Sequence, residues 1–251
     1  MRKTILAAAA ALALAAIVWA GGDPWKTKPI SEWDEKDVMD ILQNSPWAKP
    51  GLQSQGAWRP SGMSQATSNG GIPGGSNDRS HTSAGATPDT PGGLQKEDAA
   101  AAGNAIYSVF WWSSRTIRGA SFRRAVLKGT MTEADAEKDL AVTPDDLMIL
   151  VQGTNMQIFQ HRGEQAFEKT AYLQTKRNKE KIYPTKVSFL KGSDGESVTG
   201  AIFYFARKSA SGEPTIAPDE KEVDFYLQMG EAKIVTYFDP RKMVDAKGED
   251  L

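Results

Sequence analysis

The sequence predicts an α+β fold: a single mixed domain in which two or three packed helices and a docked N-terminal helix accompany a mostly antiparallel C-terminal sheet. Three observations predict it. Helical and strand patterns alternate between 104 and 173, strand patterns follow one another from Lys186 to Phe238, and a stretch rich in small and polar residues separates the N-terminal helix from the rest. We expect a signal peptide over 1–20, a helical segment docked on the main domain over 21–50, a disordered tether over 51–94 and the α+β domain over 95–251.

The first twenty residues have the pattern of a secretory signal. Arg2 and Lys3 precede an apolar run from Ile5 to Trp19, and the small residues Val18 and Ala20 suit cleavage after Ala20. The alternative is an uncleaved membrane anchor, for which the run is only marginally long. We expect export to the periplasm or the cell exterior, with no membrane span left after cleavage.

The composition excludes several classes of function. With a formal net charge of −1, the chain has no global field that would draw it to nucleic acid or to an anionic membrane. It contains no cysteine, so thiol nucleophiles, redox couples and thiolate metal sites are excluded, and the exported fold must be held by an ordinary core.

The N-terminal helix begins near Asp34 and ends near Ser45. Asp34 can cap it by accepting a hydrogen bond from the N–H of Asp37 or its neighbour. Trp33 and Val38 have the spacing of a hydrophobic staple, and Pro46 disfavours helical geometry at Ser45. A helix of about ten residues is not stable alone in water, so it must dock on the domain.

The docking cluster consists of apolar residues of this helix, its two flanking tryptophans and a tryptophan pair in the first expected strand of the domain. Adjacent strand residues point to opposite faces, so one tryptophan of the pair can enter the core while the other covers the helix. We therefore expect the apolar stripe of the helix on the sheet face near that pair. The docking residues are Trp33, Val38, Ile41, Leu42, Trp47, Trp111 and Trp112.

The stretch 51–94 contains 25 Gly, Ser, Pro or Thr among its 44 positions. Such a composition buries too little apolar surface to offset the entropy of ordering, which predicts a flexible tether.

Strands and helices of the main domain follow from local patterns. Alternating apolar residues in 223–227 predict a strand with one buried face, and Gly230-Glu231 joins it to the next strand as a hairpin. Gly129 predicts a helix end, and Thr132 with Asp135 a helix start. The expected helices cover 114–128, 132–140 and 163–173, with one turn at 156–159. The expected strands cover 104–114, 147–153, 186–190, 200–207, 221–229 and 232–238, and a helical turn at 240–244 precedes a charged tail.

Four blocks of the chain resemble a family of exported bacterial proteins of unknown function. The most distinctive is the opener WDEKDVMDILQNSPWA (33–48), which is similar to an N-terminal W-x-E-x-D…L-x-x-S-P-W-A motif followed by a Gly-rich insertion; the others are WWSSRTIRGA (111–120), LMILVQG (147–153) and IAPDEKEVDF with FDPRKMV (216–225 and 238–244). The resemblance implies a shared mixed α/β architecture and export, without an assigned activity. The tail over 245–249 is more polar than the family's ending, which argues against a final strand.

The sequence contains few groups suited to catalysis. His81 lies in the expected tether, and His161 lies in a turn before an expected helix. No nucleophile elbow, zinc motif, calcium loop or phosphate-binding glycine loop is present. We therefore predict no cofactor, no metal ion and no assigned catalytic residue.

Basic residues occur in two places. Arg115, Arg118, Arg123, Arg124 and Lys128 share one expected helix, where about 100° per residue spreads them around the axis, and Lys176–Lys181 forms a basic turn. An anionic-polymer contact is the alternative to a solvated turn, and nucleic acid is not expected.

Two classes of function are compatible with these patterns. The first is a non-enzymatic interaction or structural protein of the envelope or the exterior, with an envelope protein or polymer as its partner. The alternative is a periplasmic or secreted hydrolase that uses carboxylates, or Ser with His161, in a cleft. A concave, partly buried pocket around His161 or a carboxylate pair would favour the hydrolase.

Overall fold

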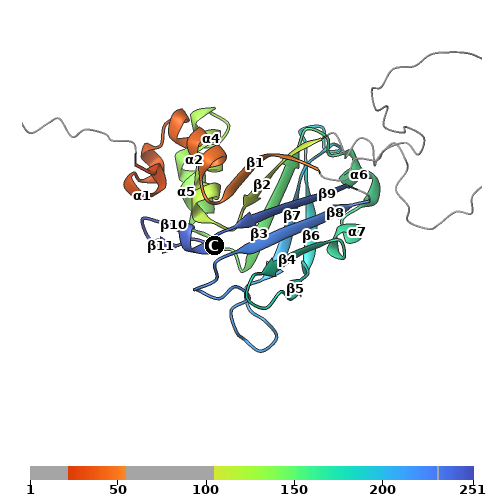
Figure 1. Ribbon diagram of the computed structural model, residues 1–251. Helices are drawn as coiled ribbons and strands as arrows, with labels where there is room; N and C mark the ends of the chain where they lie inside the picture. Colours follow the sequence, from red (N-terminus) through yellow and green to blue (C-terminus); the bar gives the residue numbers. More distant parts are fainter. Residues whose placement is uncertain (1–21, 55–104, 231) are drawn as a thin grey trace, which may run out of the picture.

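A computed structural model describes residues 22–54, 105–230 and 232–251, and it confirms the α+β class. Two antiparallel sheets pack face to face (Figure 1). The first has the strand order β1-β2-β3-β7-β6, with β1 Ala48–Gln53, β2 Ile106–Trp111, β3 Asp146–Gly153, β7 Val198–Ala206 and β6 Lys186–Lys191. The second has the order β5-β4-β8-β9, with β5 Lys181–Ile182, β4 Ala171–Thr175, β8 Val223–Met229 and β9 Ala232–Phe238.

The core lies between the two sheets, and strands such as β2, β4 and β8 alternate buried and more exposed residues. Trp111 meets Phe238 with ring centroids 5.1 Å apart, and Phe203 meets Phe225 at 5.5 Å; each pair joins one sheet to the other. The expected β8–β9 hairpin is confirmed, with Met229 paired to Ala232.

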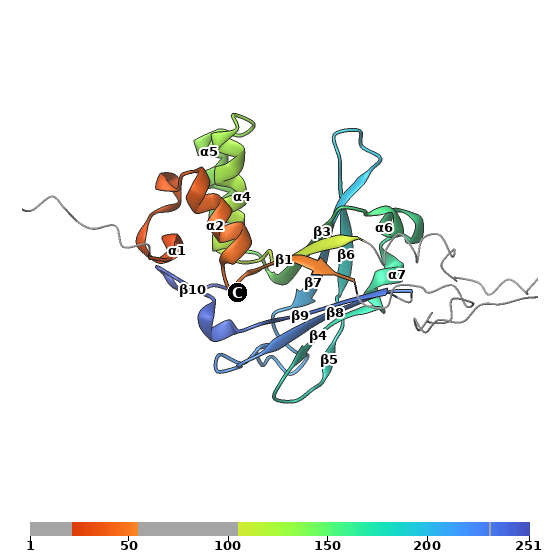
Figure 2. The same cartoon turned by 45° about the horizontal axis from the view of Figure 1, so that its top comes forward.

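Helices gather at the two ends of the sheets (Figure 2). At one end lie α1 Pro24–Thr27, the 3-10 turn η1 Ile30–Glu32, α2 Glu35–Asn44, α4 Arg115–Leu127 and α5 Glu133–Ala141. The short helices α6 Gln157–Arg162 and α7 Gln165–Glu168 lie at the other end (Figures 1 and 2). No helix of the described residues is long and apolar enough to cross a bilayer.

Helix ends in the described ranges follow the expected chemistry. Asp34 caps α2 by accepting from the N–H of Asp37 at 2.8 Å, and the Asp37 carboxylate accepts from the N–H of Asp34 in return. Thr132 caps α5 through its hydroxyl, which accepts from the N–H of Asp135 at 3.1 Å. Gly129, at φ +70°, ends α4, because the left-handed conformation there lets its N–H reach the carbonyl of Val126 at 2.9 Å.

Three sequence expectations need correction. The helix expected over 163–173 is a single turn, α7, followed by strand β4, because Tyr172 and Leu173 pair with Tyr226 and Phe225 of β8. Residues 51–53, assigned to the tether, belong to β1. The polar tail does form strands: after the 3-10 turn η2 Pro240–Lys242, β10 Val244–Asp245 pairs with β11 Gly248–Glu249.

The placement of the N-terminal helix also differs from the expectation. Its apolar stripe packs mainly on α4 and on β1, beside the sheet end rather than over the sheet face. The rest of the expected tether, the expected signal peptide and His81 lie outside the described residues.

Candidate functional site

The expected docking residues lie where the N-terminal segment meets the domain. Trp33, Val38, Ile41, Trp47 and Trp111 are fully or almost fully buried in the common core. Leu42 and Trp112 are partly buried against it, and both line a pocket of about 380 Å³ between α2, α4 and the outer face of the first sheet.

Trp25 belongs to this cluster although the sequence reasoning missed it. Its ring meets that of Trp47 edge to face, with centroids 5.8 Å apart, and its backbone carbonyl accepts from the N–H of Ala246 at 3.2 Å. The signal that could have found it is Pro24 in the first turn of a short helix, because proline is favoured at that position and places Trp25 on a defined helical turn.

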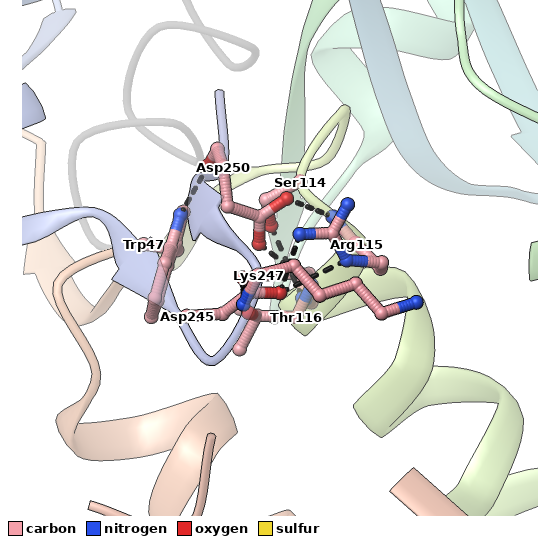
Figure 3. A network of polar contacts seen from close by, with 8 residues as sticks. Trp47, Ser114, Arg115, Thr116, Asp245, Lys247 and Asp250 are labelled. Atoms are coloured by element: carbon pink, nitrogen blue, oxygen red, sulfur yellow. Dashed lines mark hydrogen bonds and ion pairs between the residues drawn. The ribbon is translucent and has the colours of Figure 1, made fainter. Parts of the chain in front are cut away.

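The C-terminal tail fastens the N-terminal segment to α4 (Figure 3). The Asp250 carboxylate accepts from the backbone N–H groups of Arg115 at 2.7 Å and Thr116 at 2.9 Å, while its backbone oxygen accepts from the indole N–H of Trp47 at 2.6 Å. The first N–H groups of a helix have no intrahelical acceptor and lie at the positive end of its dipole, so a carboxylate is stabilised there.

An ion pair holds the tail on its other side. The Arg115 guanidinium donates through Nε and Nη2 to one oxygen of Asp245, at 2.9 and 2.7 Å, and the other oxygen accepts from the N–H of Lys247 at 2.7 Å (Figure 3). We call the set Trp47, Arg115, Thr116, Asp245 and Asp250 the C-terminal clasp.

A pocket of about 590 Å³ opens beside the clasp, and we call it the arginine pocket. Its volume lies within the range of small-molecule sites. The lining comes from distant parts of the chain: the end of β2, α4, the loop before β3, the end of β7 and the tail. Its polar members include Ser113, Arg118, Arg207 and Asp250, and its apolar members include Leu140, Leu147, Ile216 and Leu251.

Arg118 is a buried cation held by neutral groups. Its side chain is 7% exposed, and Nη1 donates to the carbonyls of Val142 at 2.8 Å and Asp139 at 3.3 Å, at the end of α5. Its Nε and the hydroxyl of Ser113, itself 3% exposed, have no hydrogen-bond partner among the described residues. Buried donors without acceptors are rare in folded proteins, because each costs about 1–3 kcal/mol.

Arg207 is held in the same manner. Its Nε donates to the carbonyl of Pro144 at 3.1 Å and its Nη2 to the backbone oxygen of Leu251 at 2.8 Å. Burial lowers the pKa of Arg118 and of Arg207, and the charge of Asp250 opposes this on both. Both stay protonated, because an arginine is deprotonated only far above physiological pH. Among the described residues, neither guanidinium pairs with an Asp or Glu carboxylate within 4 Å, but Arg207 contacts the oxygen of Leu251, the last residue of the sequence, and also feels the charges of Asp146 and Asp250.

Arg115 also lines this pocket, whereas Arg123 of α4 and the residues of the basic turn do not. Arg123 donates to the carbonyl of Trp33 and contacts Glu133. Arg177 pairs with Asp219 at 2.5 Å, and Lys181 lies 4.5 Å from the ring centre of Tyr172. Arg123, Arg177 and Lys181 therefore each interact with a group next to them and not with the pocket.

For the hydrolase alternative, two carboxylates, Glu249 and Asp250, do line the arginine pocket, where Asp250 is bound by N–H groups of α4. His161 is exposed on α6 and lines none of the pockets described here. A further pocket of about 420 Å³, between the N-terminal segment, α4, α5 and the tail, is lined mainly by apolar side chains and by the clasp residues Arg115 and Asp245. Within the described ranges no three His, Asp or Glu side chains are placed to hold a metal ion.

Comparisons with known proteins show no family to which the chain belongs. No family model and no curated protein matches the chain. Two solved structures are similar in part. The N-terminal part of the bacterial S-layer protein SbsC has 14% identity and a TM-score of 0.22, covering 54% of this chain and 30% of that one. The S-layer protein rSbsC(31-844) has 12% identity and a TM-score of 0.21, covering 54% and 18%. The chain spans less than a third of either, and likenesses this weak carry no argument about function.

Proposed function

We propose that this chain is an exported, non-enzymatic binding protein whose arginine pocket takes an anionic group. The observation that carries the proposal is the state of Arg118, a residue 7% exposed whose Nε has no hydrogen-bond partner among the described residues, in the lining of a pocket large enough for a small molecule. A buried cation without a paired anion is unfavourable, and an anion that enters the pocket would relieve that cost.

A second arginine and a serine hydroxyl support the same ligand class. Arg207 and Ser113 line the pocket with Arg118, and backbone carbonyls hold both guanidinium groups in place before any ligand arrives. Such preorganisation lowers the entropy cost of binding. The hydrolase alternative, by contrast, has no supporting geometry at His161.

The binding test compares two arginine variants. Isothermal titration of the processed protein with acetate, hexanoate and inorganic phosphate should show binding of at least one of these anions, and Arg207→Met should weaken it at least tenfold. Arg241→Met is the matched control, because Arg241 is exposed on η2 and pairs with Asp239 outside the pocket. Failure of all three anions to bind at millimolar concentration contradicts the proposal.

Export and family membership are parts of the same proposal. The signal pattern over 1–20 and the resemblance of 33–48 to the opening motif of exported proteins support both. N-terminal sequencing of the mature protein should begin at Gly21; an intact Met1 in a membrane fraction would contradict export. An envelope protein or polymer as the partner stays a prediction.

A further inference from the structure

We propose that the arginine pocket selects an amphipathic carboxylate, with the charged end on Arg118 and Arg207 and a short aliphatic body against Leu140, Leu147 and Ile216. This inference rests on the proposed function and names the ligand class of that site.

The lining of the pocket combines two kinds of group. Ser113, Arg118 and Arg207 are polar members. Leu147 and Ile216, at 3% and 6% exposure, are apolar members, together with half-buried Leu140 and the exposed prolines Pro214 and Pro218. A purely ionic ligand would leave the apolar members in contact with water, so the lining favours a ligand that also has an aliphatic part.

The tail already places this combination of groups in the pocket. Leu251 is half-buried against the hydrophobic core, and its backbone oxygen accepts from Nη2 of Arg207 at 2.8 Å. Leu251 thus shows that this end of the pocket can hold an aliphatic side chain next to an oxygen atom that accepts from Arg207.

Nearby acids favour a single negative charge on the ligand. Asp250 and Glu249 line the same pocket, and Asp250 acts electrostatically on both arginines. Because repulsion from these carboxylates scales with ligand charge, a dianion such as phosphate is penalised more than a monocarboxylate. A planar carboxylate also matches the fork of a guanidinium group.

The decisive measurement is a titration of the processed protein with acetate, butanoate, hexanoate and phosphate. Each methylene group that packs against the apolar members should tighten binding roughly threefold to fourfold. We therefore expect hexanoate to bind more tightly than butanoate, and butanoate more tightly than acetate, with phosphate weaker than hexanoate.

Variants of lining residues test whether the dependence of affinity on chain length arises in the arginine pocket. Leu140→Ser should remove most of the dependence of affinity on chain length, while Arg207→Met should weaken binding of all the carboxylates. Arg207→Lys keeps the charge and should restore part of the affinity, which separates loss of binding from loss of folding; thermal unfolding of each variant checks the fold.

The possible outcomes separate this inference from the proposed function. Affinities independent of chain length, or phosphate binding as tight as hexanoate, overturn the inference and leave the proposed anion site intact. Absence of binding by every anion overturns both. N-acetylleucine, added as a further ligand, distinguishes two sources of the same chemistry: tighter binding than hexanoate points to a peptide end, and weaker binding to a free acyl chain, each in agreement with an amphipathic carboxylate.

Discussion

Trp47 is held both by its ring and by its indole N–H. The ring meets the edge of Trp25, and the N–H donates to the backbone oxygen of Asp250. Because the side chain is completely buried, its removal both loses apolar burial and leaves an acceptor without a donor. One residue of the N-terminal segment therefore depends on the C-terminal tail for its environment.

The first prediction concerns this residue. Trp47→Ala should lower the free energy of unfolding by about 3 kcal/mol or more, and Trp47→Phe by about 1–2 kcal/mol, because phenylalanine fills much of the space but cannot donate to Asp250. Urea denaturation measures both. Met39→Ala is the control, since Met39 lies on α2 at 41% exposure and should change stability by less than about 0.5 kcal/mol. An unchanged midpoint and slope for Trp47→Ala would show that the segment is not docked.

Tyr107 offers a test of burial through pH. Its hydroxyl donates to the carbonyl of Asn155 at 3.3 Å, and burial raises its pKa to about 12. The unfolded tyrosine ionises near pH 10, so the folded state holds its proton more tightly. The resulting stability is fully present below about pH 10 and is lost as the pH rises from about 10 to 12.

The second prediction concerns Tyr107→Phe. Above about pH 10, this variant should lose less unfolding free energy than the wild type, and the difference should reach up to roughly 2–3 kcal/mol. Denaturation at pH 8, 10 and 11 measures the difference. Tyr183→Phe, at an exposed tyrosine, is the matched control. Equal alkaline loss in wild type and Tyr107→Phe would contradict the prediction.

At the scale of elements, α4 connects the two halves of the candidate site. Its first N–H groups bind Asp250 of the tail, its next turn presents Arg118 to the arginine pocket, and its side packs on α2. An aspartate more than 130 residues away in sequence thus supplements Ser114, which caps the same helix by accepting from the N–H of Ile117 at 3.1 Å.

The third prediction tests the aspartate at this helix end. Asp250→Asn should destabilise the protein by about 1–2 kcal/mol, because the amide loses the charge that the helix dipole favours and one of its two acceptor oxygens. Hydrogen exchange of the Arg115 and Thr116 amides should accelerate. Glu249→Gln changes the neighbouring exposed carboxylate and should have little effect. If Asp250→Asn and Glu249→Gln have the same stability and the same amide exchange rates, the clasp does not stabilise α4.

At the scale of the whole molecule, strands β1 and β2 are neighbours joined by a long connection. Gln53 pairs directly with Ile106, so the two ends of that connection lie side by side. A short turn can geometrically replace everything between the buried residues Ser54 and Ala105.

The fourth prediction follows from that pairing and from the composition of 51–94. Replacing residues 55–104 by a Gly/Asn turn of about four residues should cause no loss of stability, and loop closure predicts a gain of up to about 2 kcal/mol. Thermal and urea unfolding measure the change. A loss of several kcal/mol would mean that the replaced residues pack on the domain.

Local chemistry in the sequence was enough to predict many elements. The cap at Asp34, the stop at Gly129, the buried strand over 147–153 and the β8–β9 hairpin depend on residues close in sequence, and the structure contains each of them. The α+β class followed from the same patterns. The expectation for 163–173 was wrong because its apolar residues fit a helix as well as a strand, and pairing with β8 decided the matter.

The sequence by itself determined the helices α2, α4 and α5, most of the strands and the need of the short N-terminal helix for a tertiary partner, since these depend on propensity, capping and periodicity over a few residues. Only the tertiary structure decided which partner that helix has, that Trp25 and Asp250 join its cluster, and that Arg118 and Arg207 face one pocket. The physical reason is that burial and the pairing of charges depend on groups far apart in the chain: Trp47 and Asp250 form one contact because the folded sheets bring the tail back to the start of α4.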